Sequence, residues 1–174
     1  MSVLLEILKY TIPGLVVFAS VYYVLKMYMD QHYQTLALGK KTEAQKIILP
    51  IRLQAYERLM LLCDRIQLPN LLLRIRSGQM SVAELKAALM IAVAQEFDHN
   101  TSQQLYVSDT LWRILSLAKA DTLTMITKAA EGLEPEHSDE MLVQRIFALL
   151  DQLGENTTVH RAQMAIRTEA GQLF

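Results

Sequence analysis

Hydrophobic residues are concentrated in one stretch near the amino terminus, YTIPGLVVFASVYYVLKMYM, which runs from Tyr10 to Met29. Between Tyr10 and Leu25 there is no charge, and Thr11 and Ser20 are the only hydrophilic side chains apart from the tyrosine hydroxyls. A helix that packs on a soluble core normally keeps a polar stripe. Because this stretch has none, the pattern favours a membrane-spanning helix.

The length of the stretch is close to what a bilayer requires. The uncharged run covers 16 residues, which is short for a hydrocarbon core of about 30 Å. It lengthens if a lysine near its end extends its aliphatic stem and leaves its ammonium at the interface. Tyrosines gather at the same end, as in an aromatic belt. We therefore predict a single-pass anchor over residues 1–29, with the lipid bilayer as partner and with these interface residues: Tyr22, Tyr23, Lys26 and Tyr28.

The stretch admits two other interpretations. A cleaved signal peptide has a positive amino-terminal region and small residues at its cleavage site. Here Glu6 balances Lys9, and no A-x-A-like site follows the apolar run. A soluble helical bundle with a buried first helix is the remaining alternative.

Basic residues flank the stretch unequally. Lys9 stands alone on the amino-terminal side, whereas the carboxyl-terminal side continues from Lys26 into a basic group: Lys40, Lys41, Lys46 and Arg52. The positive-inside tendency then predicts an external amino terminus and a cytoplasmic domain. The basic group could also contact anionic lipid headgroups, or it could only set topology or form a solvated face. The single cysteine, Cys63, excludes an intrachain disulfide and suits a reducing compartment.

The remaining sequence has helical periodicity. Residues 30–49 read as a juxtamembrane helix that frays near Gly39, followed by a link, and Pro50 begins a helix. That helix has apolar positions at three- and four-residue spacing: Leu53, Tyr56, Met60, Cys63 and Ile66. Ser81 and Glu84 form the S-x-x-E capping pattern and predict a helix to about Phe97.

Further helices are expected over residues 102–131, 138–153 and 156–171. Gly132 and Gly154 end the first two, and Ser138 and Asn156 are the expected caps of the second and third. The core candidates of the first are Leu105, Trp112, Leu115, Leu123 and Ile126. Glycine and proline are scarce, with 6 and 4 residues. The predicted fold is therefore all-α, a transmembrane helix followed by a domain of about five helices over residues 50–174.

Charge is distributed unevenly along the chain. From Lys40 to Arg76 there are eight basic and three acidic residues, and from Asp121 to Phe174 there are four basic and nine acidic residues. The acidic end includes a cluster that could be a docking surface for a basic partner, or only a solvated surface: Glu131, Glu134, Glu136, Asp139 and Glu140.

No pattern in the sequence indicates catalysis or a cofactor. Glu96-x-x-His99 has the spacing of a di-iron ligand pair, but the second such pair, Glu134 to His137, contains a proline and lies in a link. Cys63 falls on the apolar stripe of its helix and is interpreted as a core residue rather than a nucleophile. We therefore predict neither catalytic residues nor a metal or other cofactor.

Taken together, the pattern predicts a membrane-tethered, non-enzymatic adaptor, scaffold or accessory subunit of a membrane complex. Its partner would be another protein or further copies of itself, with neither nucleic acid nor a small-molecule substrate. The alternatives are a membrane-associated helical domain that binds a ligand or acts as an enzyme, and the soluble helical bundle described above.

Overall fold

The computed structural model describes the backbone of residues 2–154 and 156–173. Side chains are described for residues 9, 11, 13–30, 45–154 and 156–173. The described elements are all helical apart from one isolated bridge between Ser81 and Ser138, so the predicted all-α class is confirmed. The chain divides into two compact units, Met1–Ile48 and Leu49–Phe174.

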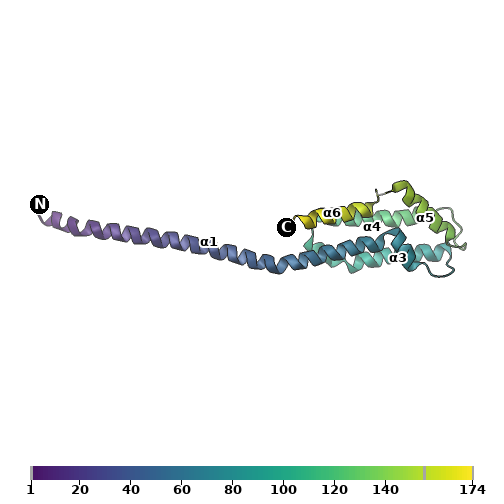
Figure 1. The fold of residues 1–174 in the computed structure, drawn as a ribbon, viewed down its shortest axis with the longest axis horizontal. Helices are drawn as coiled ribbons and strands as arrows, with labels where there is room; N and C mark the ends of the chain where they lie inside the picture. Colours follow the sequence, from purple (N-terminus) through teal and green to yellow (C-terminus); the bar gives the residue numbers. More distant parts are fainter. Residues whose placement is uncertain (1, 155, 174) are drawn as a thin grey trace. The chain divides into compact units, whose positions relative to one another are not determined.

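The first helix, α1, extends over Ser2–Ile66 (Figure 1). The predicted fraying near Gly39 and the new helix at Pro50 are therefore wrong, because the helix continues through both residues. Proline inside a helix removes one backbone hydrogen bond, and glycine costs about 1 kcal/mol relative to alanine. The leucine, alanine, glutamine and lysine residues around them favour helix strongly enough to compensate.

The predicted transmembrane anchor is also wrong. Within the part of the chain that the structure describes, no helix combines the length and the apolarity needed to cross a bilayer. The 16 uncharged residues extend over ~24 Å as a helix, short of the ~30 Å hydrocarbon core. Lys26 follows directly and Asp30 comes four residues later, and the tyrosines and Pro13 lower the hydropathy of the run. The predicted single-pass localisation, with an external amino terminus and a cytoplasmic domain, depended on this anchor and is wrong as well.

Two helices follow α1 closely. Helix α2 covers Leu68–Ile75, and α3 covers Val82–His99. The predicted capping box at the start of α3 is confirmed: the Ser81 amide donates to Glu84 Oε2 at 2.9 Å, and the Glu84 amide donates to Ser81 Oγ at 3.2 Å. Gly78 lies between these helices with φ of 57°, in the left-handed region that glycine adopts without strain.

The long helix expected over residues 102–131 is two elements. A 3₁₀ helix, η1, covers Thr101–Tyr106, and α4 covers Asp109–Ala130. Ser108 separates them, because its Oγ accepts a hydrogen bond from the Leu111 amide at 3.1 Å and starts a new helix. The core prediction for Leu105 is therefore wrong: its side chain is 79% exposed, whereas Leu115 and Ile126 of α4 are buried.

The N-caps of the last two helices lie one residue later than expected. Helix α5 covers Glu140–Leu153 with Asp139 as N-cap, and α6 covers Thr158–Gly171 with Thr157 as N-cap. Thr157 Oγ1 accepts a hydrogen bond from the His160 amide at 3.2 Å. Gly154 ends α5 as predicted.

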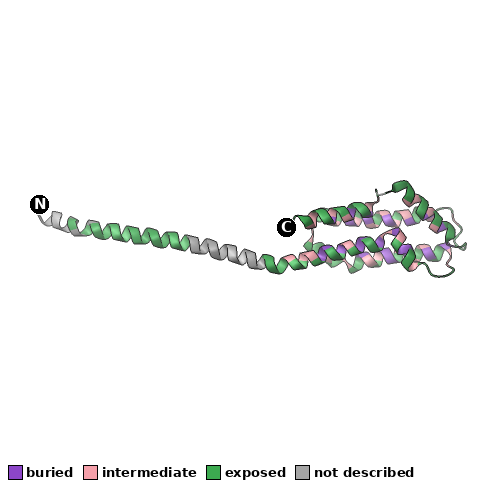
Figure 2. Ribbon diagram, viewed as in Figure 1, coloured by how far each residue is buried: buried purple, intermediate pink, exposed green. Residues whose placement is uncertain are grey.

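Helix α4 is central in the unit Leu49–Phe174. It packs against α3, α5 and α6, and buried side chains line these contacts (Figures 1 and 2). Burying one such aliphatic side chain contributes about 1.5–3 kcal/mol. Every one of the helices α1 to α6 contributes to the largest fully buried side chains, and η1 contributes none of them. These side chains are Leu59, Leu62, Ile66, Leu71, Leu85, Leu89, Leu111, Leu115, Ile126, Leu142, Ile146 and Ile166.

Candidate interaction surfaces

The most unusual surface is the apolar segment of α1 from Leu15 to Met29, here called the apolar segment. Twelve of its large hydrophobic side chains are between 47% and 74% exposed, and Figure 2 colours this part of α1 as exposed. Because they occupy nearly successive positions at about 100° per residue, they lie on every side of the helix. A helix of this length is ~22 Å long and ~10 Å wide, so its side wall covers ~700 Å². The largest apolar patch on a typical monomer is about 300–600 Å².

The residues predicted to contact a membrane do not form one group in the structure. Tyr22, Tyr23, Lys26 and Tyr28 are exposed on the apolar segment. The side chains of Lys40 and Lys41 lie outside the described residues. Lys46 is exposed on α1.

Arg52, the last residue of the predicted basic group, belongs to a hydrogen-bonded network inside the unit Leu49–Phe174. Its Nε donates to the Tyr106 carbonyl at 3.1 Å, and its Nη2 donates to the Tyr56 hydroxyl at 3.0 Å. The Tyr56 hydroxyl in turn donates to Glu169 Oε1 at 2.9 Å. Arg52 therefore connects α1 to the end of η1 and, through Tyr56, to α6.

Glu169 is the centre of this network. Its Oε1 also accepts from the Ser108 amide at 2.8 Å, and its Oε2 accepts from the Ser108 hydroxyl. One carboxylate thus joins α1, the N-cap of α4 and α6. No local pattern predicts this network, because its members are separated by up to 113 positions and follow no motif.

Ionisation of the network follows from these contacts. Burial alone raises the pKa of Glu169, but hydrogen bonds from Ser108 and Tyr56 and the charge of Arg52 outweigh burial, so the pKa is lowered. The pKa of Tyr56 is raised, first by burial and then by its hydrogen bond to Glu169, with Arg52 opposing the shift. The network therefore holds a carboxylate and a neutral phenol.

The predicted acidic docking cluster is divided. Glu131, Glu134, Glu136 and Glu140 are exposed around the connection between α4 and α5. Asp139 is only 2% exposed, and Arg76 binds its carboxylate through two hydrogen bonds of 2.7 and 3.0 Å. The pKa of Arg76 is raised, first by the hydrogen bond to Asp139. Asp139 therefore fixes the α4–α5 connection and is not available to a partner.

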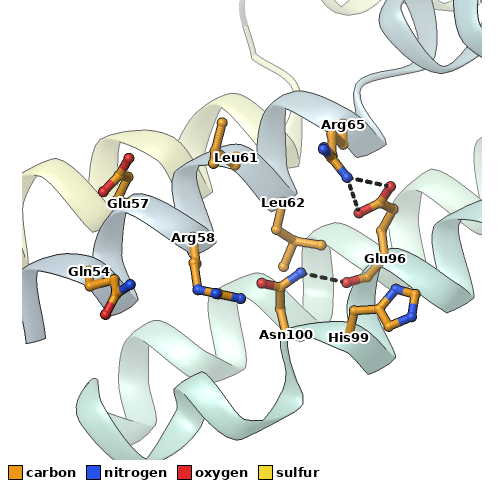
Figure 3. A pocket seen from close by; sticks show the side chains of 9 residues that line it. All are labelled: Gln54, Glu57, Arg58, Leu61, Leu62, Arg65, Glu96, His99 and Asn100. Atoms are coloured by element: carbon orange, nitrogen blue, oxygen red, sulfur yellow. Dashed lines mark hydrogen bonds and ion pairs between the residues drawn. The ribbon is translucent and has the colours of Figure 1, made fainter. Parts of the chain in front are cut away.

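A cleft of about 430 Å³ lies between α1 and the end of α3 (Figure 3). Arg58 extends toward Asn100, while Arg65 meets Glu96 at 3.3 Å. Glu96 also pairs with Arg74 at 2.9 Å, and the Asn100 amide donates to the Glu96 carbonyl at 2.8 Å. The cleft walls are thus charged, with Leu61 and Leu62 between the arginines.

The chemical candidates from the sequence are accounted for by structural contacts. Glu96 binds two arginines, and the exposed His99 is the last residue of α3. Among the described residues, no group of three or more metal-ligating side chains could hold an ion. Cys63 is fully buried, and burial raises the pKa of its thiol to about 12, so it is not an activated nucleophile.

Comparison with protein families identifies a match over nearly the whole chain. The model of DUF7935, described as a family of unknown function, matches residues 2–173. Searches of the curated proteins and of the solved structures returned no match.

Proposed function

The chain belongs to the family of unknown function DUF7935, and we propose that it is a non-enzymatic assembly subunit whose α1 helix binds helices of a partner protein. The apolar segment is the observation that carries this proposal. Its exposed side chains point in every direction, so a single shallow groove would leave most of them in water. A partner that supplies several helices would enclose them.

The size of the segment fits such an association. Its side wall of ~700 Å² approaches the ~800 Å² that each partner buries in a standard protein interface. The Ser20 hydroxyl needs no partner outside the helix, since it donates to the Val16 carbonyl at 2.8 Å. The helical domain from Leu49 onward would then be the part displayed by the assembly.

Site-specific photo-crosslinking in cells tests the proposal. A photoreactive residue replaces Phe18 or Tyr23, which are 72% and 74% exposed on the apolar segment. The matched control replaces Leu73, which is 85% exposed but lies on α2. We expect one discrete protein adduct from positions 18 and 23, none from 73, and loss of the adduct in a Val21→Asp variant.

The partner identified in this way should retain the full chain in the reverse purification and should fail to retain the Val21→Asp variant. Adducts formed only with lipid would contradict the proposal, because the apolar segment would then be covered by something other than protein. Equal labelling of the same protein from position 73 would contradict it as well, because the contact would not be specific to this segment.

A further inference from the structure

The outward face of α1 between residues 54 and 65 has an ordered arrangement of charges. The opposite face is buried in the core, through residues such as Leu59, Leu62 and Ile66. Leu61 lies at the middle of the outward face and is 52% exposed. With about 100° per residue, Glu57 and Asp64 lie roughly 50° to one side of Leu61. Arg58 and Arg65 lie about 50° to its other side.

These charges are available for contacts outside the chain. Glu57 and Arg58 are exposed and make no hydrogen bond or ion pair within the described part of the chain. Arg65 is 57% exposed, and both of its bonds to Glu96, at 3.3 and 3.4 Å, are donated by Nη1. The N–H groups of Nε and Nη2 are not used in these bonds. Asp64 accepts from Asn70 through Oδ1, which leaves Oδ2 for a second donor.

We propose that this outward face of α1 binds the same face of a second copy of the chain, in a parallel two-fold dimer. The chemistry is self-complementary only in that orientation. A two-fold axis parallel to the helices brings the basic side of one α1 opposite the acidic side of the other, at the same height. Arg58 then faces Glu57 of the second copy, and Arg65 faces its Asp64, with the two Leu61 side chains between them.

The antiparallel arrangement places like charges together. A two-fold axis across the helices keeps each side of the face opposite the same side of the other copy, so arginines would meet arginines and carboxylates would meet carboxylates. Like charges across an interface suppress the wrong pairing. The arrangement resembles the flanking charge pairs that set orientation and partner choice in coiled coils.

The dimer is distinct from the assembly proposed above. It uses residues of the unit Leu49–Phe174 and does not require the apolar segment to bind protein. Charge variants at positions 57, 58, 64 and 65 leave the apolar segment unchanged, and a Val21→Asp change leaves the charged face unchanged. Failure of one proposal is therefore distinguishable from failure of the other.

The test uses two differently tagged copies of the full chain, kept in solution with a mild non-ionic detergent. We expect wild-type copies to co-purify. The all-acidic variant (Arg58→Glu with Arg65→Glu) and the all-basic variant (Glu57→Arg with Asp64→Arg) should each lose self-association roughly tenfold or more. An equal mixture of the two variants should recover it, because every facing pair is again opposite in charge.

Controls separate this effect from misfolding and from general charge. Lys128→Glu with Arg161→Glu changes two exposed basic residues elsewhere and should leave co-purification unchanged. The exchange Glu57→Arg with Arg58→Glu reverses only the two residues that have no partner in the chain. Its own dimer keeps every facing pair opposite in charge, so self-association should be unchanged, whereas its association with wild type should weaken because positions 57 and 58 then face like charges.

A disulfide reports the orientation. Gln54 is exposed and lies about 20° from Leu61 around the helix and about two turns, ~10 Å, toward the amino terminus. Gln54→Cys should therefore form a cross-linked dimer only if the helices are parallel, and the buried Cys63 does not compete. Each of four results would overturn the proposal. Wild-type copies do not co-purify, or association survives the all-acidic and all-basic changes. Alternatively, the mixture of the two variants does not recover association, or no cross-link forms at position 54.

Discussion

Glu169 is the residue on which three helices depend. It accepts hydrogen bonds from Tyr56, from the Ser108 amide and from the Ser108 hydroxyl. Because its pKa is lowered in the folded state, the carboxylate contributes stability above the unfolded value, near 4.5. That contribution is lost as the pH falls through the lower, folded pKa.

We expect Glu169→Gln to reduce the free energy of unfolding at pH 7 by about 1–3 kcal/mol, because an amide cannot accept all three bonds. The difference between wild type and variant should shrink as the pH falls below 4.5, because the unfolded chain binds a proton at Glu169 before the folded protein does, and the folded carboxylate is protonated only at its lower pKa. Urea denaturation at several pH values measures both effects. Glu136→Gln, at an exposed position, is the control and should change neither. A constant difference at all pH values would show that the charge of Glu169 is not what matters.

Cys63 makes a second prediction at this scale. It is completely buried, and burial raises the pKa of its thiol to about 12. At pH 8 we expect a thiol-specific colorimetric reagent to react with the native protein only as fast as the protein opens, and with the urea-unfolded protein at once. Ala83→Cys, at an exposed position of α3, supplies a positive control that reacts immediately. Rapid labelling of the wild type under native conditions would contradict the burial.

At the scale of elements, Ser108 divides one predicted helix into η1 and α4. Periodicity alone placed Leu105 and Leu115 on the same apolar stripe. The cap at Ser108 interrupts the helix between them, so that Leu105 is 79% exposed and Leu115 is 1% exposed. The stripe therefore describes a core only within one uninterrupted helix.

Alanine substitution at these two leucines checks the division. Leu115→Ala should lower the free energy of unfolding by about 2–5 kcal/mol, because it leaves a cavity where the central helix α4 packs into the core. Leu105→Ala should change it by less than about 0.5 kcal/mol, as at other exposed positions. Chemical denaturation of both variants measures the difference. Similar destabilisation by the two would mean that η1 is packed into the core.

At the scale of the whole molecule, each compact unit has its own character. The described buried core begins at Ala55, and every member of it lies in the unit Leu49–Phe174. The exposed apolar segment lies in Met1–Ile48. The first unit therefore provides exposed surface, and the second provides the stable core.

Removing residues 1–48 should leave a fragment that unfolds cooperatively, with a free energy of unfolding within about 0.5 kcal/mol of the full chain. The reason is that every described core residue lies in the unit Leu49–Phe174, so the fragment keeps that core. The photo-crosslinked partner of the apolar segment should no longer be retained, while the dimer through α1 residues 54–65 should persist. Circular dichroism with urea measures the first result and co-purification the others. Loss of the folded fragment would show that α1 needs its amino-terminal part for stability.

The sequence by itself determined the all-helical class, the capping box at Ser81 and the burial of residues such as Cys63 and Leu115. These depend on spacing within one or two turns of helix, which is local information. It also located the exceptional stretch from Tyr10 to Met29, but the anchor inferred from it was wrong, since its apolar length falls short of a bilayer.

Only the tertiary structure decided which charges are structural and which are exposed. Asp139 and Arg52 resembled their surface neighbours in sequence, yet Asp139 binds Arg76, and Arg52 joins the network around Glu169. The two residues of each such pair are separated by between 54 and 113 positions in the sequence. Their partners are chosen when helices pack, because packing brings together side chains that no local spacing relates.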